Sequence, residues 1–197
     1  MTTVRMIYDW LDGWAPFAAA VSFDNAGLLA GSGEESVSAA LLALDITPAV
    51  VEEAKKAGAQ LIVSHHPVIF DPLRRLVPGS APYLLCEAGI AAICAHTNLD
   101  LAPGGVNTWL AERLGLSRVR PLSLDGPSGL PESLCGELPS PLSSEAFARH
   151  VKKALGCEAV EFTPGVGEIR TVGLCSGGGG AGAGAPRPDP RGGGRGS

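Results

Sequence analysis

The chain has 197 residues, of which 45% are apolar and 18% are charged, and its formal net charge is −5. This composition is typical of a globular protein, and the length allows one large domain or two small ones. The negative net charge, without a Lys/Arg cluster in the folded part, argues against a nucleic-acid partner. No window approaches the roughly 18 uninterrupted apolar residues of a membrane helix, so we expect no membrane partner either.

The cysteines and the start of the chain indicate a cytoplasmic protein. The five cysteines are odd in number and form no CxxC motif, so they are expected to be reduced thiols rather than a disulfide or zinc framework. Cys86 and Cys94 are interpreted as small core residues. The opening "MTTVRMIYDWLDGW" carries acids where a signal peptide would carry its apolar region.

The first third of the chain predicts a helix, a turn region, a strand and a second helix. "VRMIYDWLDGWAPFAAA" has helical periodicity that should end near Pro16, and residues 22–36 are rich in turn formers. "VSAALLALDI" predicts a strand, because it is too apolar and too short to be an exposed helix. Thr47 and Pro48 then form a favourable helix start, and Gly58 a favourable helix end.

The next residues repeat this alternation. "LIVS" predicts a strand, "APYLLCEAG" a short helix, "IAAICAH" a third strand and "GGVNTWLAERLG" another helix. Apolar strands linked by helices indicate a parallel sheet covered on both faces. We therefore predict an α/β fold with a mostly parallel sheet flanked by helices.

The second half begins another α/β unit. Residues 117–135 are predicted to be a loop, followed by a strand, a helix opening near residues 143–144, and a strand around "AVEF"; "EIRTVGLCSG" predicts one more strand. From residue 177 the chain is Gly/Pro/Arg-rich and is expected to be disordered. The predicted organisation is a first lobe over residues 1–116, a partial second lobe over 117–176 and a tail over 177–197.

The candidate chemistry lies at two strand ends. His65 and His66 directly follow one predicted strand, and His96 and Asp100 follow the next. Ligands gather beyond the carboxyl ends of parallel strands, so both groups should open onto one edge of the sheet. Imidazole and carboxylate are usual ligands of divalent metals such as zinc, iron and manganese. A metal site at this edge is the prediction, and structural histidines are the alternative.

The His65-His66 pair suggests two ions rather than one. Adjacent residues in a regular strand point in opposite directions, so each histidine is expected to hold one of two neighbouring ions, with Asp100 able to bridge them. His150 lies on a separate helix and is interpreted as a surface or capping residue. Asp24 and Asn25 are expected to form local hydrogen bonds rather than to take part in catalysis.

Three motifs together resemble a known family. "FDNAGLLAG", "LIVSHHPVIF" and "AHTNLD", in this order, are similar to the Nif-three-like family, also called GTP cyclohydrolase 1 type 2 homologues. The resemblance implies a two-lobed fold, a ring-shaped homohexamer and a dinuclear site with two divalent metal ions per subunit. It implies metal binding by His65, His66 and Asp100, and a catalytic, substrate-facing role for His96. Asp24 and Asn25 match a motif close to the family's site.

The resemblance stops where the tail begins. The family's second lobe supplies a further histidine and glutamate through a "GH..TE"-type segment, which this sequence lacks. The change near residue 177 is typical of a frameshift or a truncated gene, and a genuine divergent tail is the alternative. Three protein ligands are too few to hold two ions firmly, so we expect an incomplete second lobe and impaired activity.

Three functional hypotheses follow. The first is a metal-dependent hydrolase of this family, acting on a nucleotide or another small phosphorylated or cyclic substrate. The second is a non-catalytic oligomeric scaffold or metal-handling protein. The third is a nonfunctional fragment. The substrate itself is not predicted.

Overall fold

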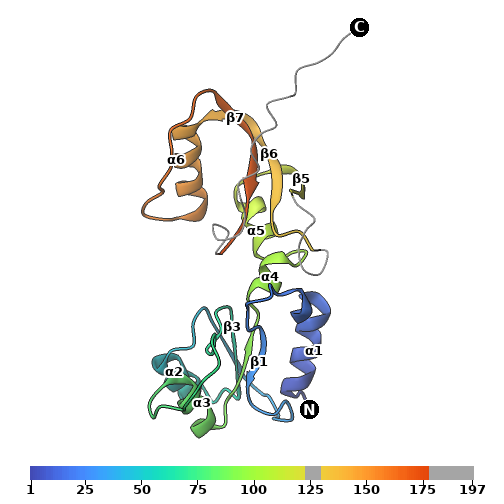
Figure 1. Ribbon diagram of the computed structural model, residues 1–197, viewed down its shortest axis with the longest axis vertical. Helices are drawn as coiled ribbons and strands as arrows, with labels where there is room; N and C mark the ends of the chain where they lie inside the picture. Colours follow the sequence, from blue (N-terminus) through green and yellow to red (C-terminus); the bar gives the residue numbers. More distant parts are fainter. Residues whose placement is uncertain (123–129, 178–197) are drawn as a thin grey trace.

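The computed structural model describes residues 1–122 and 130–177, and it contains two sheets that lie at opposite ends of an elongated molecule (Figure 1). The larger sheet has the order β1-β4-β3-β2. Its strands are β1 (Gly27–Ala30), β2 (Ala40–Ala43), β3 (Leu61–Ser64) and β4 (Ala91–Cys94). The tail that was predicted to be disordered lies, except for Gly177, outside the described residues.

Three of these strands are parallel, as predicted, and the fourth is a correction. β2, β3 and β4 pair in parallel, whereas β1 pairs with β4 in the antiparallel direction. β1 lies in residues 22–36, which were predicted to be turns. It is only four residues long, and Gly27 at its start and Gly31 directly after it have φ of +119° and +99°. Such a short run between glycines shows no alternation that the sequence could reveal.

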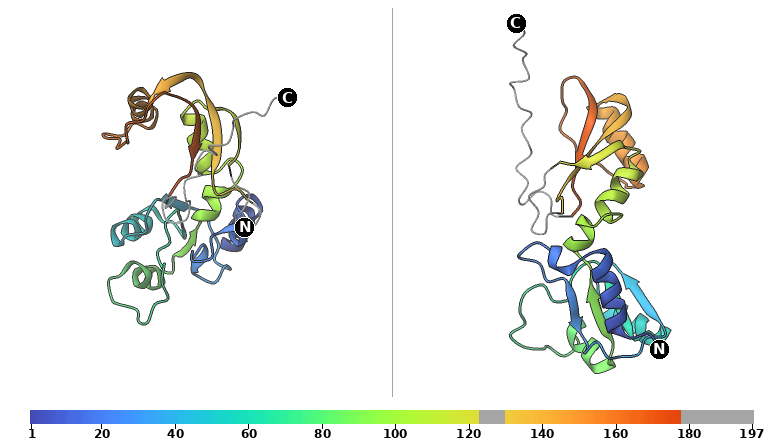
Figure 2. Two further views of the ribbon diagram at one scale, coloured as in Figure 1. Left: turned by 45° about the horizontal axis from the view of Figure 1, so that its top comes forward. Right: turned by 90° about the vertical axis from the view of Figure 1, so that its right-hand side faces the viewer.

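Helices cover both faces of the larger sheet (Figure 2). One face packs against α1 (Val4–Trp14) and the 3₁₀-helix η1 (Phe17–Ala19), and the other packs against α2 (Pro48–Ala57) and α3 (Ala81–Ala88). Successive residues of β3 point to opposite faces of the sheet: Leu61 packs into the core on the α1 side, and Ile62 into the core on the side of α2 and α3. The predicted mostly parallel sheet flanked by helices is therefore confirmed.

The ends of α1 and α2 follow the local rules. α1 ends at Trp14, ahead of Pro16. The Thr47 hydroxyl accepts a hydrogen bond from the Val50 amide at the start of α2, and Gly58 closes that helix in the left-handed conformation.

Two helices join the larger sheet to the smaller one. The five-residue α4 (Thr97–Leu101) was not predicted, and it carries most of the "HTNLD" motif. The predicted α5 (Val106–Arg113) follows it. None of the described helices is both long and apolar enough to cross a bilayer.

The smaller sheet is antiparallel, in the order β5-β6-β7. Its strands are β5 (Ser117–Pro121), β6 (Leu134–Ser143) and β7 (Glu168–Leu174), and α5 and α6 (Ser144–Leu155) contact it. A small separate core contains Ala111, Leu114 and Leu174. Ser143 caps α6 through the Ala146 amide, which matches the predicted helix start.

Two predictions in this half were wrong. Residues 117–121 form β5 instead of a loop; every residue of that strand is exposed, so it shows no buried face in sequence. The strand predicted around "AVEF" does not form: residues 159–162 have no strand structure, and Phe162 is 45% exposed. Without a neighbouring strand, a short apolar run has no hydrogen-bond partners.

Candidate metal centre

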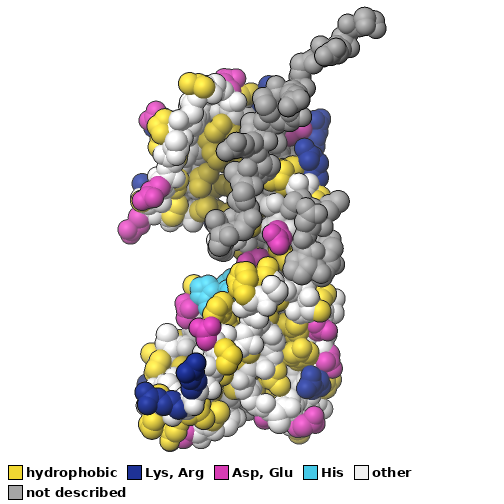
Figure 3. All heavy atoms as spheres, in the orientation of Figure 1, with side chains coloured by type: hydrophobic (Ala, Val, Ile, Leu, Met, Phe, Trp, Pro, Cys, Tyr) yellow, Lys and Arg dark blue, Asp and Glu magenta, His cyan; other side chains and the backbone are white. Residues whose placement is uncertain are grey.

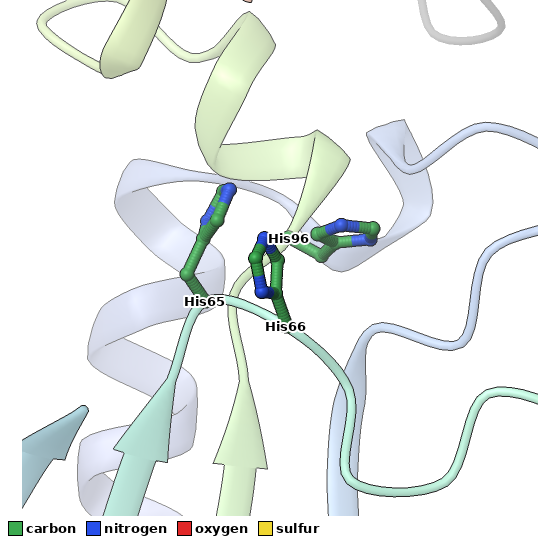
Figure 4. Close-up of side chains that lie close together, drawn as sticks. All are labelled: His65, His66 and His96. Atoms are coloured by element: carbon green, nitrogen blue, oxygen red, sulfur yellow. The ribbon is translucent and has the colours of Figure 1, made fainter. Parts of the chain in front are cut away.

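Three histidines meet at one edge of the larger sheet. His65 and His66 directly follow β3, and His96 lies between β4 and α4. Figure 4 shows the two adjacent rings rising side by side from the turn, with the His96 ring facing them. One ring nitrogen of each residue lies within 4.8 Å of those of the other two. The structure therefore contains a three-histidine cluster of a size that suits one metal ion.

The two adjacent histidines do not point in opposite directions. Their ring centroids are 5.1 Å apart. The expected opposition applies to a regular strand, but β3 ends at Ser64, whose hydroxyl donates to the His66 carbonyl at 2.8 Å. This turn swings the second ring back toward the first. The expectation that the two rings point apart was therefore wrong, and the binding of two ions stays a prediction.

In all three histidines, Nδ1 is already hydrogen-bonded. The acceptors for His65, His66 and His96 are the Ala95 carbonyl at 3.0 Å, Asp45 Oδ1 at 2.7 Å and Asp24 Oδ1 at 2.8 Å. Carbonyls and ionised carboxylates only accept hydrogen bonds, so each Nδ1 carries the proton. In a neutral imidazole this leaves Nε2 with a free lone pair, which is the form that binds metal.

Asp24 is the best-satisfied acid of the site. Its side chain is fully buried, and it accepts hydrogen bonds from the backbone amides of Asn25 and Thr97, the Thr97 hydroxyl and His96. Burial acts to raise the pKa of Asp24, but the hydrogen bonds from Thr97 and His96 outweigh it and lower the pKa below its ordinary value. Asp24 is therefore a carboxylate at neutral pH.

Asp100 is the least satisfied acid. It is 6% exposed, and its Oδ1 has no hydrogen-bond partner in the described structure. This oxygen lies 3.7 Å from His65 Nε2, too far for a hydrogen bond. Burial raises the pKa of the Asp100 carboxyl above its ordinary value. An orphaned buried oxygen beside a free imidazole nitrogen suits a divalent cation, so the residues present fit a metal.

The structure brings some of the candidate site residues together and leaves others apart. His65, His66 and His96 form the cluster, and Asp100 approaches it only at His65. Asp24 and Asn25 make long-range contacts as well as the expected local one. His150 lies elsewhere, where its Nε2 hydrogen-bonds the Leu114 carbonyl at the end of α5.

Cys86 is exposed, so its interpretation as a core residue was wrong, whereas Cys94 is buried.

Asp45 was missed in the sequence. It lies just beyond the end of β2 and binds His66, yet it was not singled out. Side chains that follow the carboxyl ends of parallel strands are expected at the ligand-binding edge of the sheet, and β2 is such a strand. This position is the sequence signal for Asp45.

The site is open to solvent. Figure 3 shows the histidines on a hollowed flank of the molecule, between the parts that contain the two sheets. The side chains of His65, His66 and His96 are 21%, 45% and 20% exposed. A small molecule can therefore reach the cluster.

These features define an α/β protein with a candidate metal centre at the strand ends of its larger sheet. The sequence matches the family model described as Duf34/NIF3 (NGG1p interacting factor 3) over residues 2–185. The chain therefore belongs to the Duf34/NIF3 family, as the three motifs indicated.

Curated relatives carry the same family name. A "GTP cyclohydrolase 1 type 2 homolog" of Halalkalibacterium halodurans is 40% identical over 123 residues, which is 60% of this chain and 33% of the relative. The protein of that name from Staphylococcus aureus strain Mu50 is 43% identical over 112 residues, which is 55% and 31% of the two chains. The matched part thus spans about a third of these relatives.

Solved structures support the fold. Staphylococcus aureus hypothetical protein SA1388 is 27% identical with a TM-score of 0.81, covering 89% of this chain and 72% of that one. Reduced HcgD from Methanocaldococcus jannaschii is 30% identical with a TM-score of 0.66, covering 77% and 60%.

Proposed function

We propose that this protein binds divalent metal at the three-histidine cluster and uses it in hydrolysis of a small nucleotide, phosphorylated or cyclic substrate. The observation that carries the proposal is the shared state of the three imidazoles: they converge, and each has its Nδ1 occupied. In the neutral imidazoles this leaves Nε2 of each ring unprotonated, and three such nitrogens are a favourable donor set for zinc, iron or manganese.

Each side chain has a distinct role in the proposal. His65, His66 and His96 hold one ion through Nε2, and Asp100 adds an oxygen ligand beside His65. A dinuclear site, as implied by the family resemblance, would need further donors beside Asp100, because Nε2 of His65 has one lone pair and its Nδ1 is hydrogen-bonded to the Ala95 carbonyl. His96, whose ring is hydrogen-bonded to the buried Asp24, is also proposed to face the substrate. When bound, the metal would act as a Lewis acid on a substrate oxygen.

Metal analysis tests the proposal. The purified chain is stripped with chelator, reloaded separately with zinc, iron(II) or manganese, desalted, and analysed for metal per chain. One ion per chain supports the three-histidine site, and two support the dinuclear site. Substitution of His65, His66 or His96 by Ala should each lower the metal content. Complete absence of bound metal at neutral pH would refute the proposal.

Turnover separates the hydrolase from the alternative, a metal-handling protein or scaffold. The name of the curated relatives makes GTP the first substrate to assay, followed by cyclic nucleotides. Hydrolysis that requires metal and is lost in His65→Ala supports an enzyme. Firm metal binding without turnover of any of these substrates favours the metal-handling role.

A further inference from the structure

The dipeptide Asp24-Asn25 contacts both histidine-bearing segments, although it lies on the loop between η1 and β1 and carries no histidine itself. Asp24 reaches His96 and Thr97, more than 70 residues away in sequence. Asn25 reaches Ile69, three residues after His66. One short segment therefore joins the two loops that build the cluster.

Asp24 accepts hydrogen bonds from the His96 ring and from three further donors. Its Oδ1 accepts from His96 Nδ1 and the Asn25 amide, while its Oδ2 accepts from the Thr97 amide and hydroxyl. All four donors point at a carboxylate that is fully buried. An asparagine in its place would present an NH2 group, which is a donor, to these four donors. The two backbone amides cannot become acceptors, whereas the Thr97 hydroxyl can rotate and His96 can move its own proton to Nε2.

Asn25 holds the other loop. Its Nδ2 donates to the Ile69 carbonyl at 2.6 Å. The residues between, Pro67 and Val68, connect this point directly to His66. This hydrogen bond links the end of the histidine turn to the loop that carries Asp24, and through Asp24 to His96.

The chain between α1 and β1 is attached to the His96 segment at further points. The Val21 amide, on the same loop as Asp24, donates to the Thr97 hydroxyl at 3.1 Å, and the Asn98 side chain donates to the carbonyl of Ala15, at the end of α1, at 2.7 Å. Asn98 also accepts from the His96 amide. These bonds hold the backbone even without Asp24, so a substitution there should alter the ring rather than the fold.

From these contacts we infer that Asp24 and Asn25 are positioning residues of the metal centre: Asp24 keeps Nε2 of His96 unprotonated, and Asn25 holds the His65-His66 turn against it. This inference rests on the proposed metal site and adds the residues that preorganise it. It also adds contacts with distant segments to the local hydrogen bonds that were expected of the dipeptide.

Cobalt(II) binding tests the inference, because its visible absorption reports ligand geometry independently of activity. Asp24→Asn should weaken cobalt affinity about 10–100-fold and change the intensity of the absorption bands. Asn25→Ala should weaken it by about 10-fold while removing a single hydrogen bond. Glu53→Gln and Glu53→Ala, on the exposed side of α2, are the matched controls and should bind as the unsubstituted protein does.

The outcomes separate the two proposals. If the unsubstituted protein binds no cobalt, the proposed function fails and the inference falls with it. If the unsubstituted protein binds cobalt, and Asp24→Asn and Asn25→Ala bind it with the same affinity and the same spectrum, only the inference is overturned.

A second measurement applies even if Asp24→Asn fails to fold. The ¹⁵N shifts of the imidazoles in the metal-free, unsubstituted protein should show His96 protonated at Nδ1. A proton on Nε2 in neutral His96 would overturn the inference.

Discussion

Asp100 shows at the residue scale how a binding site can reduce stability. Its carboxyl is buried, one oxygen lacks a partner, and burial raises its pKa. Because the pKa is higher in the folded protein than in the unfolded chain, the folded state holds the proton more firmly. The stability contributed by protonation is therefore present in acid and is lost as pH rises through the raised pKa.

Asp100→Asn should consequently stabilise the metal-free protein at neutral pH by about 1 kcal/mol, since it removes an unsatisfied buried charge. The same substitution should weaken metal binding. Urea denaturation of the stripped protein between about pH 4 and 7 measures the first effect, and the gain should shrink toward the acid end. Asp71→Asn, at an exposed position, is the control. Equal or lower stability of Asp100→Asn at pH 7 would contradict the prediction.

The cysteines allow a second prediction at this scale. Burial raises the pKa of Cys94 to about 12, so its thiol stays protonated and shielded, whereas Cys86 is exposed. Brief treatment with iodoacetamide, followed by peptide mass spectrometry, should show Cys86 alkylated well before Cys94. Denaturant should abolish the difference. Equal labelling in the folded protein would show that the Cys94 core is open.

At the scale of elements, helix ends are where local sequence controls structure. Thr47 was predicted to begin a helix from its residue type and the following proline, and its hydroxyl accepts from the Val50 amide at 3.3 Å. The contact lies within four residues, so no distant part of the chain has to be known.

Thr47→Ala should therefore lower the free energy of unfolding by about 1 kcal/mol. Thr47→Ser keeps the hydroxyl and should cost much less. Denaturant titration of both variants measures the difference. If Ala and Ser destabilise equally, the loss comes from the methyl group rather than from the cap.

Strands at sheet edges behave differently. β1 and β5 were missed because four or five residues with mixed or full exposure carry no periodic pattern, and their strand structure depends on β4 and β6 beside them. The predicted "AVEF" strand failed for the opposite reason, since it has the composition of a strand and no neighbour.

At the scale of the whole molecule, the metal site connects segments that are distant in sequence. Residues from the loop before β1 and from the ends of β2, β3 and β4 all contact the cluster. A ligand that binds only this assembled arrangement stabilises the folded state through linkage.

Zinc at about 100 times its dissociation constant should add about 2.7 kcal/mol and raise the melting temperature of the stripped protein by about 5–10 °C. Differential scanning calorimetry with and without zinc measures this. The combined His65→Ala, His66→Ala and His96→Ala variant should show no rise. A rise of the same size in that variant would place the zinc elsewhere.

The homohexamer implied by the family resemblance stays a prediction. Large apolar side chains such as Trp10 and Leu42 are exposed on the single chain, at 66% and 78%. Light scattering of the purified protein would give the oligomeric state.

The sequence by itself determined the alternation of strands and helices that makes β2, β3 and β4 parallel, the helix caps, and the positions of His65, His66 and His96 at strand ends. These features depend on periodicity and on contacts a few residues apart. Only the tertiary structure decided that the two adjacent rings turn toward each other, that His96 completes the cluster and that Asp24, Asn25 and Asp45 hold it in place. Those features depend on where separate loops meet at the edge of the sheet, and hydrogen bonds between residues more than 20 positions apart leave no periodic signal in one sequence.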